Sequence, residues 1–115
     1  METSDFLPLS PPVFHVLLAL ADGDKHGYAI LKEVEERTDG RVQLSTGTLY
    51  AIIKRLLSDG LIEETRERPD NDDERRRYYR LTPFGRKVAV AEAERLEEMI
   101  AAAREKRLIR KPRHA

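Results

Sequence analysis

The sequence predicts a mainly α-helical fold with one small β-hairpin and a long C-terminal helix. Three observations support this prediction: a strongly patterned central helix, a hairpin signal after it, and a final run of helix-forming residues. The central helix lies within STGTLYAIIKRLLSDGLI, residues 45–62, where apolar residues recur at the spacing of one helix face. Its expected core-facing residues are Leu49, Ile52, Ile53, Leu56 and Leu57. The helix is expected to end at Asp59 and Gly60, because glycine commonly follows the last helical residue.

The opposite face of this central helix is small and basic. Gly47 and Ala51 would let the backbone approach another surface closely. Lys54 and Arg55 carry cations, and the face also holds hydroxyl groups, which suit phosphate oxygens and base edges. The apolar stripe alone is typical of any core helix, but the combination favours a helix that enters a groove of nucleic acid.

Length and composition limit the class of protein. The chain has 115 residues, the size of one domain or of a small domain with one appended element. It has no cysteine, which excludes a disulfide framework, thiolate zinc ligands and a cysteine nucleophile. No apolar run reaches the roughly 20 residues that span a bilayer, and the first ten residues are acidic. We therefore expect a soluble cytoplasmic protein with no signal peptide and no membrane partner.

Charge is balanced in total but segregated along the chain. The 21 basic and 21 acidic side chains give a net charge of zero, whereas nucleic-acid-binding proteins are usually basic. Cations are concentrated at 75–80 and 104–113, and acids at 33–36, 70–74 and 92–98. A single cationic face is compatible with this distribution; the alternative is that the charge runs are simply solvated surface.

Two shorter helices are predicted before the central one. The first begins after the capping residue Ser10, with prolines in its first turn, and ends at residues 22–23. The second begins near residues 26–27 and ends at the Thr-Asp-Gly sequence of 38–40. The expected buried side of the second helix is Tyr28, Ile30, Leu31 and Val34.

A β-hairpin is predicted after the central helix. Two β-prone runs, residues 61–68 and 75–82, are joined by the turn-rich acidic segment 69–74. Alternation in the second run separates its side chains into an outward set of Arg76, Tyr78 and Arg80 and an inward set of Arg75, Arg77, Tyr79 and Leu81. Twist near the tip would still free Arg75 and Arg77 to reach a nucleic-acid backbone. Phosphates would repel the acidic tip, which either neutralises neighbouring arginines or stays clear of the nucleic acid.

The last segment is predicted to form one continuous helix, residues 83–107, followed by a disordered basic tail, residues 108–115. Thr82 can cap this helix, Pro83 suits its first turn, and its composition is rich in Ala, Glu, Arg and Leu. A narrow apolar stripe runs along it: Val88, Ala91, Leu96, Met99, Ile100 and Ala103. The helix extends past a compact domain of residues 1–82, so pairing with a second copy would cover the stripe. Packing against its own domain is the alternative.

The order of three helices, a hairpin and a long helix is that of a winged helix-turn-helix with a dimerisation helix. The four motifs LSPPVFHVLLAL, HGYAILKEVEERT, TGTLYAIIKRLLSDGLIEE and RRRYYRLTPFGRK resemble the PadR family of transcriptional regulators, from Leu9 to about Arg104. The resemblance implies a homodimer that binds double-stranded DNA, usually a bacterial repressor that leaves its operator when a small-molecule effector binds or conditions change. A dimer of this kind is expected to bind a palindromic operator. With a single C-terminal helix, the chain resembles the short branch of the family.

The resemblance and the residue pattern together predict which residues contact DNA. The predicted residues are Thr46, Gly47, Thr48, Tyr50, Lys54, Arg55, Arg75, Arg76, Arg77 and Tyr78. The first residues of a recognition helix reach base edges, and its unpaired N–H groups favour a phosphate. Tyr50 suits a phosphate contact, with a half-buried aromatic at the edge of the core as the alternative. Lys54 and Arg55 could instead be solvated helix cations.

No catalytic, metal or cofactor site is predicted. The three histidines are too few and too scattered to form a metal site: His15, His26 and His114. No glycine-rich phosphate loop or nucleophile elbow occurs, so enzymatic activity is not expected. Phe6, Phe14 and Phe84 are candidates for lining an effector pocket, with a core role as the alternative. A winged-helix module that binds protein rather than specific DNA is the alternative function.

Overall fold

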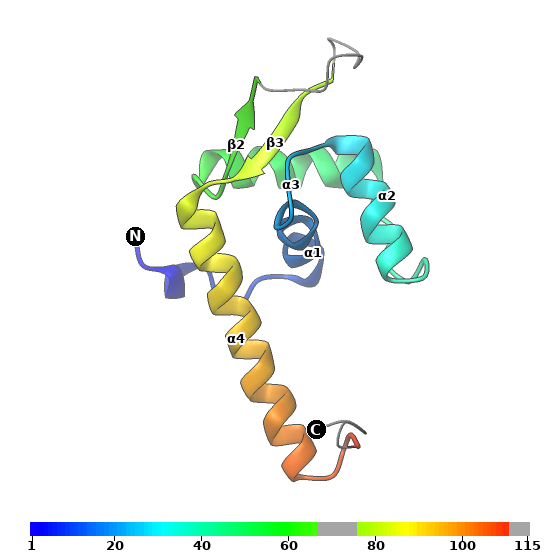
Figure 1. Cartoon of the computed structure of the whole chain (residues 1–115), viewed down its shortest axis with the longest axis vertical. Coiled ribbons are helices and arrows are strands. Elements are labelled where there is room, and N and C mark those ends of the chain that lie inside the picture. The colour runs from blue at the N-terminus through cyan, green and yellow to red at the C-terminus, as the bar shows by residue number, and fades with distance from the viewer. Residues whose placement is uncertain (67–75, 111–115) are drawn as a thin grey trace.

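Helices make up most of residues 1–66 and 76–110, the part of the chain that the computed structural model describes (Figure 1). The elements in chain order are η1 Thr3–Phe6, α1 Pro11–Leu20, β1 Lys25–His26, α2 Gly27–Arg37, α3 Thr46–Ser58, β2 Ile62–Thr65, β3 Tyr78–Leu81 and α4 Pro83–Glu105. The predicted fold class is confirmed, with four α-helices and a small three-stranded antiparallel sheet within the described residues.

Side-chain caps define where three of the helices begin. At α2, α3 and α4 the capping side chain accepts a hydrogen bond from the backbone N–H three residues later. The donor–acceptor distances are 3.2 Å for His26, 3.0 Å for Ser45 and 2.9 Å for Thr82. Gly40 and Gly60 follow α2 and α3 with φ of 76° and 75°, a left-handed conformation that glycine adopts without steric cost. The predicted boundaries of these helices are confirmed to within about two residues.

The sheet has the order β1-β3-β2, so β3 is its central strand. β2 and β3 form the predicted hairpin, with Ile62 opposite Leu81 and Thr65 opposite Tyr78. β1 was not predicted. It has only two residues, too few for an alternating pattern, and it forms because Lys25 and His26 pair with the other edge of β3.

The core is formed by apolar side chains from α1, α2, α3, the start of β2 and the start of α4. Its fully buried members include Leu17, Leu20, Ile30, Val34, Leu49, Ile53, Leu56, Leu61, Ile62 and Val88. Two residues predicted to face this core do not. Tyr28 is 64% exposed because it lies in the first turn of α2, at the sheet edge, and Leu57 is 36% exposed at the margin of the α3 stripe.

The start of α4 is packed directly onto the backbone that precedes β2. A Cβ atom added at Gly85 would lie 1.8 Å from the carbonyl oxygen of Leu61, so only glycine fits there. The Thr82 hydroxyl also donates to the carbonyl of Gly60 at 2.6 Å, and the Thr82 N–H donates to that of Leu61 at 3.1 Å. The position of α4 is therefore fixed relative to the end of α3.

The N-terminal segment is fastened to the same helix. The rings of Phe6 and Phe84 meet edge to face with centroids 5.7 Å apart. Glu92, which is 1% exposed, accepts a hydrogen bond from the backbone N–H of Leu9 at 2.9 Å and is paired with Arg95. The Arg95 hydrogen bond, supported by that of Leu9, holds the pKa of the Glu92 carboxyl below its usual value, against the opposing effect of burial.

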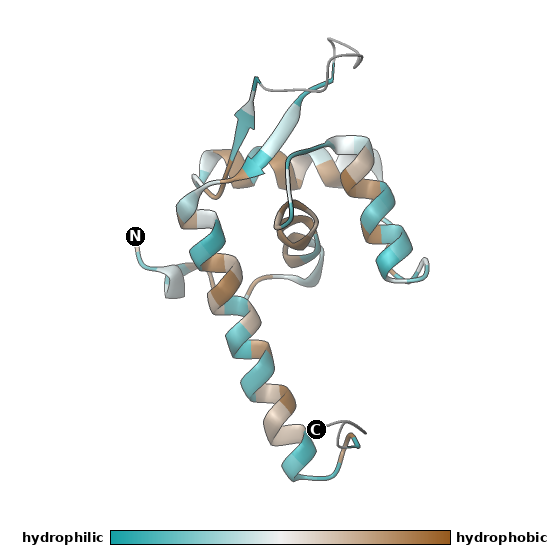
Figure 2. Ribbon diagram, viewed as in Figure 1, coloured by the Kyte–Doolittle hydropathy of each residue, from teal (hydrophilic) through white to brown (hydrophobic). Residues whose placement is uncertain are grey.

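Beyond Glu92, α4 extends away from the rest of the molecule (Figure 1). At 1.5 Å per residue, its 23 residues measure about 34 Å, and the longest dimension of the molecule is 51 Å. Apolar residues continue along the extended part, as Figure 2 shows, and Met99 and Ile100 are 56% and 42% exposed. None of the helices in the described ranges 1–66 and 76–110 is long and apolar enough to cross a membrane.

Candidate nucleic-acid interface

The first turn of α3 presents three predicted DNA-binding residues to solvent. Thr46, Gly47 and Thr48 are all exposed. The hydroxyl of the capping residue Ser45 donates to the Thr48 hydroxyl at 2.9 Å, while it accepts from the Thr48 N–H. Thr48 therefore has a fixed oxygen whose own proton remains available to an acceptor. Gly47 has no atom within 4 Å of an added Cβ, so its surroundings are open.

Tyr50 lies across the start of α2 and is 47% exposed. An added Cβ at Gly27 would lie 2.5 Å from the Tyr50 hydroxyl oxygen, so the glycine makes room for the ring. Sequence analysis offered a phosphate contact or a half-buried aromatic at the core edge for Tyr50. The position fits both, because the ring packs on α2 and the side chain stays accessible. The buried Gly27 therefore has a role in placing Tyr50 that the sequence did not reveal.

A hollow of about 310 Å³, here called the corner hollow, lies between α2, α3 and the hairpin of β2 and β3, here called the wing. Its lining residues are His26, Gly27, Tyr28, Tyr50, Arg76, Arg77 and Tyr79. Three predicted DNA-binding residues from distant parts of the sequence meet here: Tyr50, Arg76 and Arg77. The lining places three tyrosines and two arginines around one concave surface, and tyrosine hydroxyls and guanidinium groups contact phosphates.

Tyr28 belongs to the corner hollow, although its sequence pattern predicted a buried residue. Its ring is stacked on that of His26, with centroids 6.5 Å apart and planes at 12°. His26 also caps α2 through Nδ1, and its Nε2 lies 3.4 Å from a guanidinium nitrogen of Arg76. His26 is thus the point at which the first turn of α2 touches the wing. The exposure of Tyr28 could have been predicted from its position in the first turn of α2, where neighbouring elements do not yet cover the helix.

Lys54 and Arg55 lie further along the exposed face of α3. Both are exposed, and Arg55 forms an ion pair with Asp59 at 3.6 Å. In the wing, Arg77 forms a similar ion pair with Glu64 at 3.8 Å, with its side chain 71% exposed. Exposed pairs of this length contribute little and are screened by salt, so both arginines can exchange their partner for a phosphate.

The wing differs from its predicted side-chain pattern. Tyr78 and Tyr79 are both buried, at 9% and 4% exposure, so the predicted outward position of Tyr78 is wrong. Tyr79 packs with the core on one face of β3, and on the opposite face the His26 ring meets Tyr78 edge to face, with ring centroids 5.3 Å apart. Arg80, also predicted to point outward, is half-buried, bonds the Thr65 hydroxyl and lies 3.8 Å from Asp24.

Some predicted features lie outside the described residues. They are Arg75, the acidic tip 70–74, and the end of the basic tail at 111–115. The residues immediately after α4 are described: Leu108 and Ile109 are 78% and 39% exposed.

The predicted dimerisation residues fall into three groups by exposure. Val88 is fully buried in the core of its own chain, so its assignment to a dimer interface is wrong. Ala91, Leu96 and Ala103 are half-buried, whereas Met99 and Ile100 are exposed. The stripe was continuous in sequence, but the first part of it covers the sheet and α1, and only the later part is accessible.

His15 and the three phenylalanines are half-buried in the protein. His15 is half-buried, and its carbonyl accepts from Arg37 at 3.0 Å. Burial, followed by the nearby Arg37 charge, lowers the pKa of the His15 imidazole. Phe6 and Phe84 pack against the core cluster, and Phe14 is half-buried on α1. In the described part of the chain, no three metal-ligating side chains come together.

The helices α1 to α3 and the antiparallel hairpin that follows them define a winged helix-turn-helix, with α3 in the position of the recognition helix and β2–β3 as the wing. The model of the transcriptional regulator PadR-like family matches residues 16–91. The chain therefore belongs to the PadR-like family, whose members are DNA-binding transcriptional regulators and not enzymes. The resemblance carried by the four sequence motifs is confirmed.

Individual relatives agree with this assignment. The chain is 35% identical over 85 residues to the transcriptional regulator Rv3488 of Mycobacterium tuberculosis, covering 74% of this chain and 75% of that protein. Two further relatives are matched over only 64% and 21% of their own lengths. A crystal structure of a PadR family transcription regulator from Clostridium difficile has a TM-score of 0.70 at 27% identity, covering 81% of this chain and 94% of that one. Bacillus subtilis PadR in complex with operator DNA shares the fold, with a TM-score of 0.60 at 21% identity over 76% of this chain and 47% of that one.

Proposed function

We propose that this protein is a cytoplasmic transcriptional repressor that binds a palindromic operator as a homodimer. Residues 1–82 form the DNA-binding domain and residues 83–107 the dimerisation helix in this proposal. The observation that carries it is the single surface formed by the exposed first turn of α3 and the corner hollow. This surface gathers hydroxyls and guanidinium groups from α2, α3 and the wing, although the net charge of the chain is zero.

Each part of this surface has its own role in the proposal. Thr46 and Thr48, at the start of α3, contact base edges, and Gly47 lets the backbone approach the groove. A phosphate is held at the corner hollow by Tyr50, Arg76 and Tyr28. Of these, Tyr28 was not among the DNA-binding residues predicted from the sequence. Further along α3 and in the wing, additional phosphates are bound by Lys54, Arg55 and Arg77.

Dimerisation is proposed to use the accessible part of the α4 stripe. Met99 and Ile100 are exposed there, and Leu108 and Ile109, just past the helix, are exposed as well. A two-fold dimer would place two α3 helices on successive turns of one DNA face, about 34 Å apart, which is why a palindrome is expected. We further propose, from the family resemblance, that a small-molecule effector or another signal releases the repressor.

The direct test is footprinting on the DNA upstream of the chain's own gene, followed by anisotropy titrations of the protected sequence at several salt concentrations. A protected palindrome is expected. The logarithm of the affinity should fall with the logarithm of salt by about 0.9 for each phosphate neutralised. Absence of a protected site on that DNA and on genomic fragments, with folded protein, would refute the proposed function.

Three substitutions separate base contacts from phosphate contacts. Thr48→Ala is expected to change the preference between operator variants by about 1–3 kcal/mol, because it removes a base-edge contact. Lys54→Ala should instead weaken binding to all sequences and lower the salt slope by about one. Tyr28→Phe should weaken binding to all sequences by a smaller factor, since only one hydroxyl is lost. Lys87→Ala on α4 is the matched control, because Lys87 is exposed in a hollow lined by residues of η1 and α4 and by none of α3, and it should leave the operator affinity unchanged.

A second candidate function is a winged-helix module that binds protein. The ion pairs of Arg55 with Asp59 and of Arg77 with Glu64 favour it, because they neutralise two arginines on the surface proposed for DNA. A folded protein that binds every DNA sequence equally and weakly would support this candidate. Titrations of the protected sequence and of unrelated DNA at several salt concentrations therefore distinguish the two.

A further inference from the structure

Two hydroxyl groups are joined by a hydrogen bond at the start of α3. The Ser45 hydroxyl caps the helix by accepting the Thr48 N–H at 3.0 Å, and it donates to the Thr48 hydroxyl at 2.9 Å. Both residues are exposed. Because side chains of a helix lean toward its N-terminus, the Thr48 hydroxyl lies at the tip of α3, the part of a recognition helix that meets base edges.

The capping bond favours this direction of the hydrogen bond between the two hydroxyls. A hydroxyl has one proton and two acceptor lone pairs. When the Ser45 oxygen accepts the Thr48 N–H, its own O–H becomes a stronger donor, because hydrogen bonds in a chain polarise one another. The opposite direction would make two donors share the Ser45 oxygen and would lose this cooperative gain. The bonds therefore run from the Thr48 N–H through Ser45 to the Thr48 oxygen.

Thr48 is left with a polarised proton to donate. Its oxygen already accepts from Ser45, and within residues 1–66 and 76–110 no acceptor lies within hydrogen-bond reach of its proton. The hydroxyl of Thr46 has no hydrogen-bond partner in the same described ranges, so it can turn either to donate or to accept. Of the two threonines in this turn, only Thr48 has a polarity that the protein sets.

Bases differ in polarity at one place on their major-groove edges. Guanine O6 and thymine O4 are carbonyl acceptors, whereas adenine N6 and cytosine N4 are amino donors. Guanine and thymine are here called keto bases, and adenine and cytosine amino bases. A hydroxyl that donates can bond a keto base directly, and at an amino base its proton meets a second donor.

We propose that Thr48 selects a keto base in the operator, and that Ser45 is the positioning residue that sets this preference. The proposal rests on the proposed function, in which Thr48 contacts a base edge. Ser45 acts by occupying one lone pair of Thr48 and by polarising its O–H. An amino base would have to use the remaining lone pair, and it would leave the Thr48 proton without an acceptor inside the interface, which is unfavourable.

The preference is measured by selecting operators from a library of random duplexes with the natural chain and with Thr48→Val, which exchanges the hydroxyl for a methyl group. One base position should lose its preference in Thr48→Val. At this position the natural chain should favour guanine and thymine over adenine and cytosine on one strand by at least about threefold, the effect of one neutral hydrogen bond. A split between purines and pyrimidines would assign the proton to N7 and overturn the proposal. Equal weakening of all sequences by Thr48→Val would assign it to a phosphate, with the same consequence.

Ser45→Asp tests the polarity itself. Aspartate caps a helix about as well as serine, but its carboxylate has no proton, so Thr48 must donate to it and present only lone pairs to DNA. The preference should therefore invert to adenine and cytosine on the same strand. Ser45→Thr keeps the hydroxyl and should retain the original preference. An uninverted preference in Ser45→Asp would refute the role of Ser45.

Ser45→Gly is the second variant, for the case that the added carboxylate prevents DNA binding. Glycine replaces a capping residue at little cost in helix stability, but it leaves the Thr48 hydroxyl free to rotate. The keto preference should fall toward none. A preference that stays at its natural strength in Ser45→Gly would reject the proposal.

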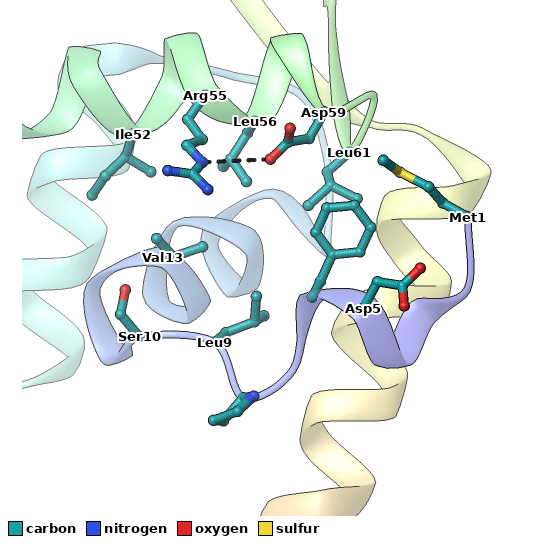
Figure 3. A pocket seen from close by; sticks show the side chains of 12 residues that line it. Met1, Asp5, Leu9, Ser10, Val13, Ile52, Arg55, Leu56, Asp59 and Leu61 are labelled. Atoms are coloured by element: carbon teal, nitrogen blue, oxygen red, sulfur yellow. Dashed lines mark ion pairs between the residues drawn. The ribbon is translucent and has the colours of Figure 1, made fainter.

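Arg55→Gln is the matched control for charge. Like Ser45→Asp, it makes α3 one unit more negative, but Arg55 lies near the other end of the helix, beside Asp59 (Figure 3). It should weaken all operators and leave the keto preference in place. Inversion in Arg55→Gln, or in the double variant of Ser45→Asp with Thr48→Val, would show that the inversion does not act through the Thr48 hydroxyl.

The same selection separates failure of this inference from failure of the proposed function. If the natural chain enriches no sequence, the proposed function is rejected, and the keto preference with it. If the natural chain enriches a palindrome whose base preferences are unchanged by the Ser45 and Thr48 variants, only the keto preference is rejected.

Discussion

The two halves of α4 both carry apolar residues at helical spacing, but their surroundings are opposite. The first half, up to Glu92, contains every buried residue of the helix: Gly85, Val88 and Glu92. In the second half the apolar residues Met99 and Ile100 are exposed. One helix thus completes the core of its own domain and then presents the same kind of stripe to solvent.

The difference shows that an apolar stripe does not reveal where its own domain ends. The end is set by the N-terminal segment, which covers α4 as far as the hydrogen bond between Leu9 and Glu92. Within the described residues the stripe continues for more than two turns past that bond. We infer that the first half determines the stability of the domain, and the second half determines the state of association. The following predictions test this division.

The largest expected effect is at Gly85. Gly85→Ala would place a Cβ atom 1.8 Å from the Leu61 carbonyl oxygen, and because that atom is backbone, α4 must shift away. We expect a loss of about 3 kcal/mol or more in the free energy of unfolding, measured by urea denaturation. Gly47→Ala on α3 is the matched control, because its added Cβ meets nothing, and it should stabilise the helix by about 1 kcal/mol. Equal effects of the two substitutions would contradict the close contact.

The next effect compares two valines on the first half of α4. Val88 is fully buried, whereas Val90 is 49% exposed two residues later. Val88→Ala should lower the free energy of unfolding by about 2 kcal/mol through the cavity it leaves, and the protein should remain associated. Val90→Ala should change stability by less than about 0.5 kcal/mol. A Val88→Ala protein that became monomeric at unchanged stability would restore Val88 to the dimer interface.

The sequence predicted the helices and the hairpin because their signals are local. Ser45 and Thr82 cap helices whose apolar periodicity begins beside them, and Gly60 ends one. β1 escaped prediction because its two residues are held only by pairing with β3, a contact across about 50 residues. Local pattern carries no information about a partner at that distance.

The candidate site was predicted in part for the same reason. The exposed start of α3 follows from its helical period, whereas the burial of Tyr78 depends on His26, which β1 brings to the outer face of β3. Tyr28 was missed because the period of α2 was extended into a first turn that nothing covers. The buried state of Glu92 was equally invisible, since its partner Leu9 is 83 positions away.

Glu92 gives a smaller effect with a defined pH dependence. Its folded pKa is lowered, first by the Arg95 hydrogen bond, so its contribution is present above the unfolded pKa of about 4.3 and is lost as the pH falls through the folded pKa. Glu92→Gln should cost about 1–2 kcal/mol at pH 7, and the difference from the natural chain should shrink toward pH 3. Glu94→Gln, at an exposed position of the same helix, is the control and should show neither change. A constant difference across this range would mean that the ionised form of Glu92 is not what joins the N-terminal segment to α4.

The smallest effect on the domain itself is expected from the second half of α4. Replacing Leu96 and Met99 together by Glu should give a monomer by light scattering, because two charges would enter the proposed interface. The unfolding free energy of the isolated domain should change by no more than about 0.5 kcal/mol, and its melting temperature should stop depending on protein concentration. Ala101→Glu is the control, since a rotation of about 100° per residue places Ala101 away from the stripe, and it should leave the association unchanged. If the double variant remained a dimer, the second copy would have to bind elsewhere, and the exposed stripe of α4 would lose its proposed role.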